Sequence, residues 1–188
     1  MNPQDLLPDR VRPLSRAEYD GLVERGVFGD ERIELLYGLL VEMSPQNPAH
    51  AQVIRQLTKL LQIALGDRAD VQAQLPVALR DDSEPEPDVA VVPAGDYSRR
   101  HPTSVLLAVE VADSSLQKDR AIKGRLYAEG GVQEYWVVNL EDQVIERHTQ
   151  PVAGAYVRVE RFERTDRIQL SAYPDVELKV SSVLTQPA

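Results

Sequence analysis

A single glutamate interrupts the most apolar stretch of this chain, the run from Ser104 to Ala112. Such a run is typical of a central strand that is buried on both faces of a sheet. Alternation along the strand places Glu110 on one face with Leu106 and Ala108, so it is a lone acid in an apolar row. An ionised carboxylate in a sheet is costly unless a cation or another partner offsets its charge. We therefore expect the fold to bring such a partner to Glu110.

A second acid and a lysine complete the pattern. Asp88 opens a predicted strand that ends at Val92, and pairing of the two strands with their acids at the same end would bring both carboxylates within reach of one ion. Mg²⁺ prefers one or two carboxylates, waters and phosphate oxygens. Lys123 follows Asp119 by four residues on the next predicted helix, so it can reach toward Glu110. Two carboxylates with an amine nearby indicate a site for a divalent metal and a phosphodiester.

The remaining pattern predicts one α/β domain over residues 1–188, with a mixed β-sheet flanked by helices and residues 1–13 as a loose N-terminal arm. Three helices are expected: one after a capping box at Ser15 and Glu18, one capped by Asn47 before Pro48 and ending at Gly66, and one from near Ser115 to about Glu129. Further strands are expected over residues 32–42 (a hairpin), 71–79, 134–140, 143–149, 155–163, 167–171 and 175–180.

Composition limits the possible locations and partners. The chain has no cysteine, which excludes disulfides, thiolate metal sites and a cysteine nucleophile. No apolar stretch is long enough to span a bilayer and no signal peptide is recognisable, so a cytoplasmic protein without membrane association is expected. The net charge of −9 counts against a broad nucleic-acid-binding surface but leaves room for a local basic patch.

Several runs together resemble a known family. They are EPDVAVV (Glu86 to Val92), VEVADSS (Val109 to Ser115), KDRAIKGRLYAEGGVQEYWVVN (Lys118 to Asn139) and ERIELLYGLLVEMSP (Glu31 to Pro45), with His50 opening a helix. This ordered set resembles the Uma-type restriction endonucleases of the PD-(D/E)XK nuclease superfamily. Each run alone is a weak signal, but the set is quite specific and covers most of the chain, from about Glu31 to Asn139.

The resemblance implies a restriction-endonuclease-like core, a Mg²⁺ or Mn²⁺ cofactor and DNA as the partner. It implies that Asp88 is the motif aspartate, that Glu110 is the motif acid and that Glu34 is an additional acid of the catalytic set. The superfamily lysine usually stands two residues after the acid, where this chain has Ala112. The resemblance therefore implies that Lys123 has taken over the role of that lysine.

Two functions from different classes stay open. The first is a metal-dependent endonuclease in which Asp88 and Glu110 hold the metal and Lys123 assists the attack. The second is a catalytically inactive nuclease-like domain that serves as a protein or nucleic-acid interaction module. A homodimer is expected, since closed dimers are the commonest oligomers. His50 is interpreted as a structural or capping residue and Tyr127 as a core residue.

Overall fold

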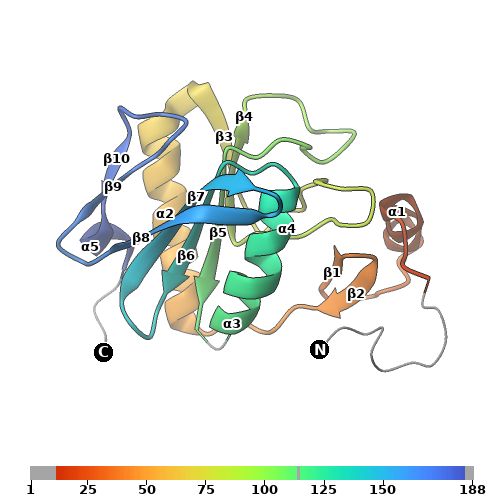
Figure 1. Cartoon of the computed structure of the whole chain (residues 1–188). Helices are drawn as coiled ribbons and strands as arrows, with labels where there is room; N and C mark the ends of the chain where they lie inside the picture. Colours follow the sequence, from red (N-terminus) through yellow and green to blue (C-terminus); the bar gives the residue numbers. More distant parts are fainter. Residues whose placement is uncertain (1–11, 114, 185–188) are drawn as a thin grey trace.

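A six-stranded mixed sheet forms the centre of the protein (Figure 1). The computed structural model describes residues 12–113 and 115–184, so most of the expected N-terminal arm lies outside the described residues. The strand order is β3-β4-β5-β6-β7-β8, and every neighbouring pair is antiparallel except β5 and β6. The strands are β3 (Ala69–Ala73), β4 (Val89–Pro93), β5 (Leu107–Ala112), β6 (Glu134–Asn139), β7 (Val144–Val152) and β8 (Ala155–Phe162).

Helices cover both faces of the sheet. A continuous helical crossover joins the parallel pair β5 and β6, as parallel strands require. It consists of α3 (Leu116–Lys118), the π-helical η3 (Asp119–Lys123) and α4 (Gly124–Glu129), and it lies in front of the sheet in Figure 1, whereas α2 (Pro48–Leu65) lies behind it. None of the described helices combines the length and apolar character needed to cross a membrane.

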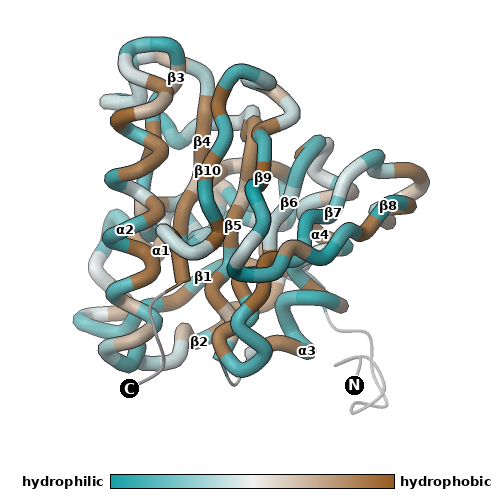
Figure 2. Tube along the Cα trace, turned by 90° about the vertical axis from the view of Figure 1, so that its left-hand side faces the viewer, coloured by the Kyte–Doolittle hydropathy of each residue, from teal (hydrophilic) through white to brown (hydrophobic). Residues whose placement is uncertain are grey.

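The two faces of β5 bury different apolar clusters, as the alternation predicts. Val109 packs in the cluster that includes Leu57 and Leu61 of α2. Ala108 packs in the cluster that includes Leu126 and Tyr127 of α4. Figure 2 shows the hydrophobic colouring concentrated along β4 and β5, between the two helical layers. Burial of this strand on both sides explains why its only acid must find a partner inside the protein.

Smaller elements attach to the two ends of this core. The capping box at Ser15 and Glu18 is present and begins α1 (Arg16–Glu24), which confirms that prediction. The predicted hairpin is also confirmed, as β1 (Ile33–Leu36) and β2 (Leu39–Glu42), and Leu35 bridges it to Glu84. The remaining elements are the 3₁₀ turn η2 (Gly66–Arg68), a separate two-stranded sheet of β9 (Arg167–Gln169) and β10 (Glu177–Lys179), and α5 (Val180–Val183).

Two predicted elements differ from the structure. The strand expected over residues 71–79 ends at Ala73, because Gln74 takes a positive φ of 54° and the chain leaves the sheet there. The helix expected to run regularly from near Ser115 contains the π-helical turn η3. A π turn forms i→i+5 hydrogen bonds, and such turns are frequent at functional sites.

The cap of α2 is tested by replacing Asn47. The Asn47 side chain accepts a hydrogen bond from the backbone N–H of His50 at 2.9 Å and donates one to Asp113 Oδ2 at 2.6 Å. We expect Asn47→Ala to lower the free energy of unfolding by about 1 kcal/mol, since the first turn of α2 loses its cap. Urea unfolding measures this loss. Asn47→Ser, which can still cap the helix, should retain most of the stability, and equal losses in both variants would contradict the capping role.

Candidate functional site

Asp88 and Glu110 lie side by side near the end of β5. This end of the strand is at the bottom of Figure 1. β4 and β5 pair with Val89 opposite Val109, and continuing this antiparallel register by one residue places Asp88 opposite Glu110. Both acids are buried, at 5% and 6% exposure. Asp88 Oδ2 accepts the backbone N–H of Val111 at 2.8 Å, which fixes the aspartate against β5.

Two donors from the crossover helix hold a single oxygen of Glu110. The Tyr127 hydroxyl donates to Glu110 Oε1 at 2.5 Å, and the Lys123 ammonium donates to the same oxygen at 3.2 Å. Tyr127 and Lys123 are buried, so neither bond competes with bulk water. Among the described residues no hydrogen bond is made to Oε2 of Glu110 or to Oδ1 of Asp88. Each acid therefore keeps one oxygen for a further partner.

Glu34 brings a third carboxylate to the site from the β1–β2 hairpin. It is 1% exposed, and its Oε2 lies 2.5 Å from the Lys123 ammonium and accepts the backbone N–H of Glu86 at 3.3 Å. Its Oε1 accepts from Lys118 at 3.1 Å. Lys118 and Lys123 are five residues apart, a spacing that the π turn aligns on one side of the helix. Lys118 is the more accessible amine, with a side-chain exposure of 34% against 3% for Lys123.

The site contains more buried acid than base. Glu34, Asp88, Glu110 and Asp119 supply four buried carboxylates, and Lys118 and Lys123 supply two amines. Burial, reinforced by Asp88, raises the pKa of Glu110 to about 8, and burial also raises the pKa of Asp119. Burial acts to lower the pKa of Lys123, but Glu110 and Glu34 outweigh it and raise that pKa above its ordinary value. The Lys123 ammonium therefore stays charged, but its attraction does not fully offset the cost of burying Glu110 as an anion.

His50 also reaches this site, from the first turn of α2. Its Nε2 lies 3.1 Å from Asp88 Oδ2, but the two groups are not aligned as a hydrogen bond, and Nε2 is buried without a hydrogen-bond partner in the described part of the chain. His50 therefore adds a ring nitrogen without a described hydrogen-bond partner next to the carboxylate of Asp88.

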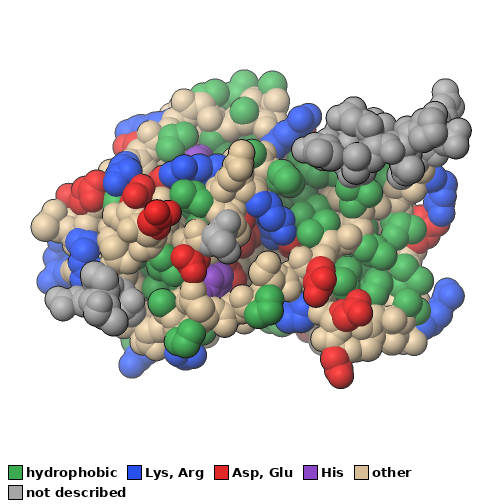
Figure 3. Space-filling view, turned by 90° about the horizontal axis from the view of Figure 1, so that it is seen from below, with side chains coloured by type: hydrophobic (Ala, Val, Ile, Leu, Met, Phe, Trp, Pro, Cys, Tyr) green, Lys and Arg blue, Asp and Glu red, His purple; other side chains and the backbone are tan. Residues whose placement is uncertain are grey.

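The residues present fit a divalent ion bound mainly by solvent and substrate. In residues 12–113 and 115–184 no group of three or more Asp, Glu, His or Cys side chains is arranged to surround an ion. The free oxygens of Asp88 and Glu110 instead offer the one or two carboxylates with which Mg²⁺ is usually held beside phosphate. Seen from below, acidic, basic and histidine side chains gather near the middle of this face (Figure 3).

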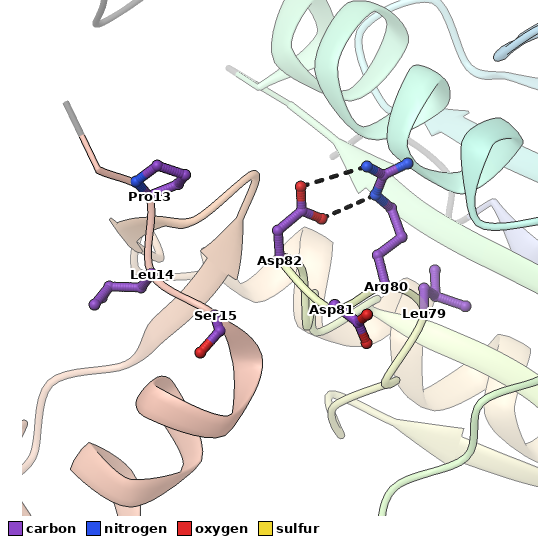
Figure 4. A pocket seen from close by; sticks show the side chains of 7 residues that line it. All are labelled: Pro13, Leu14, Ser15, Leu79, Arg80, Asp81 and Asp82. Carbon is purple, nitrogen blue, oxygen red and sulfur yellow. Dashed lines mark hydrogen bonds and ion pairs between the residues drawn. The ribbon is translucent and has the colours of Figure 1, made fainter. Parts of the chain in front are cut away.

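A hollow elsewhere on the protein carries no comparable chemistry. It measures about 620 Å³ and is lined by residues 13–15 and 79–82 (Figure 4). Arg80, the arginine among its described lining residues, is held by both oxygens of Asp82, at 2.9 and 3.3 Å. Arg80 also pairs with Glu129 at 3.2 Å. Because its cation is already neutralised by neighbouring acids, this hollow is a weaker candidate than the site at Asp88 and Glu110.

All four candidate residues from the sequence meet in this one place, namely Glu34, Asp88, Glu110 and Lys123. Sequence reasoning did not assign His50, Lys118, Asp119 or Tyr127 to the site. The spacing of four that aligns Asp119, Lys123 and Tyr127 was a usable signal for two of them. His50 and Lys118 carried no such signal, because their proximity depends on the tertiary position of α2 and on the π turn.

Comparisons with known proteins agree with this fold. The family model described as “Uma2: Putative restriction endonuclease” matches residues 17–181. Among solved structures, the chain is similar to a “putative nuclease belonging to DUF820” from Anabaena variabilis ATCC 29413, with a TM-score of 0.73 and 14% identity over 91% of this chain and 97% of that one. At that identity the likeness concerns the fold alone. A search of curated proteins found no match.

Proposed function

Because this chain belongs to the Uma2 family, we propose that it is a metal-dependent endonuclease that hydrolyses phosphodiester bonds in DNA. The observation that carries the proposal is the pairing of Asp88 with Glu110, each with one oxygen left free, beside a buried lysine. Two carboxylates and an amine at one sheet edge suit a phosphate group and a divalent cation together.

Asp88 and Glu110 would hold Mg²⁺ or Mn²⁺, which supplies an activated water and neutralises phosphate charge when bound. Val111 and Tyr127 orient these two acids through the bonds at 2.8 and 2.5 Å. Lys123 keeps its proton, because Glu110 and Glu34 favour the ammonium, and it would stabilise negative charge that develops on the phosphate.

Glu34 would act by positioning, since it holds both lysines of the site. Lys118 is the amine with access to solvent, so it would make the first contact with a phosphate. In this proposal the buried Lys123 stays in place, whereas the more exposed Lys118 reaches the phosphate. We also propose that the protein acts in the cytoplasm as a homodimer, for which the support is general: closed dimers are the commonest oligomers, and two-fold symmetry suits a duplex substrate.

A cleavage screen tests the proposed activity. Purified protein is incubated with supercoiled plasmid, single-stranded DNA and RNA, each with Mg²⁺, Mn²⁺ or EDTA. We expect nicking or linearisation of plasmid with either metal and none with EDTA, and Asp88→Asn should remove the activity because the site loses a charged metal ligand. Cleavage that persists in Asp88→Asn would point to a contaminating nuclease. No cleavage under any condition would favour the interaction module instead.

A further inference from the structure

We propose that the groove between α2 and the end of β3 binds the sugar-phosphate backbone of DNA beside the cleavage site. The groove has a volume of about 410 Å³. Its polar lining consists of Gln46, Arg55, Thr58, Lys59, Gln62 and Gln74. The identity of the ligand as DNA rests on the proposed nuclease function, whereas the anion-binding character of the groove rests on the groove itself.

The groove is positively charged, whereas the whole protein is negatively charged. The chain has a net charge of −9, yet no acidic side chain is among the described residues that line this groove. Arg55 and Lys59 are exposed and four residues apart, so they share one side of α2. Within the described residues neither forms an ion pair, and Arg55 bonds only to Gln52 Oε1, at 3.0 Å. A concave surface with unneutralised charge of one sign attracts ligands of the opposite sign.

Backbone hydrogen bonds connect the groove to the segment that carries Asp88. The N–H of Gln74 donates to the carbonyl oxygens of Pro87 and Asp88, both at 3.2 Å. Ala51, another lining residue, directly follows His50, whose Nε2 lies 3.1 Å from Asp88. A DNA strand with its scissile phosphate at Asp88 can therefore place a neighbouring phosphate in the groove, where Arg55 and Lys59 offset its charge.

Two polar atoms in the groove wall have no protein partner. Thr58 Oγ1 and Gln74 Nε2 are buried and lack hydrogen bonds in the described part of the chain. Both groups can donate a hydrogen bond, and buried donors without acceptors are rare in folded proteins. Gln74 also holds its positive φ of 54°, a strained conformation that clusters at ligand sites. Rotation of either side chain toward the groove would let it donate to a phosphate or sugar oxygen of a bound strand.

The lining also predicts the mode of binding. It contains no aromatic ring on which a base could stack, within the residues that the structure describes. Contacts are then limited to the backbone of the strand, which makes binding independent of base sequence and strongly dependent on salt. Each phosphate contact contributes about 0.7 to the slope of log affinity against log salt for a single strand.

The test compares the salt dependence of DNA binding in matched variants. Fluorescence anisotropy with a labelled single-stranded oligonucleotide is measured in EDTA across a KCl series. We expect the double variant Arg55→Ala and Lys59→Ala to bind about tenfold more weakly at low salt and to reduce the slope by about 1.4, for two lost contacts. The control is Arg99→Ala with Arg100→Ala. It removes two exposed charges from the loop after β4, at the end of the strand away from Asp88, and neither arginine forms an ion pair with another described residue.

The outcomes separate the groove from the activity. An unchanged slope in the Arg55 and Lys59 variant, or an equal loss in the control, would overturn the proposal even if the wild type cleaves DNA. A selective loss would support it even if no cleavage is ever found. Inorganic phosphate at constant ionic strength should not displace the oligonucleotide, and displacement by phosphate would reassign the groove to free anions and so overturn its role in binding DNA.

Discussion

Replacement of Glu110 by Gln is expected to reduce DNA cleavage by more than about 100-fold. Loss of a residue that only supports a metal ligand typically costs about 10–100-fold, so loss of a charged ligand should cost more. Gln keeps the shape of the side chain and still accepts from Lys123 and Tyr127 through its amide oxygen, so the packing around it should persist. Plasmid cleavage rates with Mn²⁺ measure the effect.

Glu110→Gln is also expected to change how the stability of the protein depends on pH. Burial raises the pKa of Glu110 from 4.5 to about 8, so the native state holds a proton that the unfolded chain releases between these values. Without metal, wild type should therefore lose stability as the pH rises from 4.5 to 8, by a few kcal/mol at most. Glu110→Gln cannot release this proton, so its melting temperature in EDTA should fall less over that interval.

Melting temperatures measured with Mn²⁺ are compared with those measured in EDTA. Mn²⁺ should raise the melting temperature of wild type, because the ion binds the native site and not the unfolded chain. Glu110→Gln should show much less of this rise. A variant that is far less stable than wild type in EDTA, together with no effect of Mn²⁺ on wild type, would mean that Glu110 is purely structural.

Replacement of Lys123 by Met is expected to be the most destabilising change at the site. It removes the amine that pairs with both Glu110 and Glu34, so the buried charge of this acid pair loses its counter-ion. Breaking a buried ion pair from one side costs about 3–5 kcal/mol. The loss should be larger at pH 8 than at pH 5, since burial raises the pKa of Glu110 to about 8 and this acid takes up a proton at the lower pH. Urea unfolding at both pH values measures it, and cleavage should be lost as well.

Lys118→Met is the matched control for this change. Lys118 also pairs with Glu34 but is partly exposed, so its removal should cost no more than about 1 kcal/mol. Equal losses in the two variants would contradict the assignment of Lys123 as the buried counter-charge. A Lys123→Met protein as stable as wild type would show that the fold does not need the Lys123 ammonium as a counter-charge.

The local features of this protein could be predicted from its sequence, because they depend on neighbouring residues. Caps, turns and alternation act over a few positions, and they correctly predicted the capping box at Ser15, the cap of α2 at Asn47 and the two faces of β5. The alternation was wrong for Leu106, which precedes β5 and packs with the cluster of Val109 instead of that of Ala108. The alternation also predicted that Glu110 would need a partner. The predicted ends of the elements were less accurate. For example, β3 ends early where the Gln74 N–H bonds to the carbonyls of Pro87 and Asp88, just before β4.

Only the tertiary structure decided which groups surround Glu110. His50 approaches Asp88 because α2 begins at the same edge of the sheet, and Glu34 arrives on a hairpin from a different part of the chain. Lys118 joins Lys123 because a π turn aligns residues five apart, whereas a regular helix aligns those four apart. Residue types and spacing therefore determined that this chain carries acids and an amine for one site. Long-range packing determined its charge balance, which no local pattern encodes.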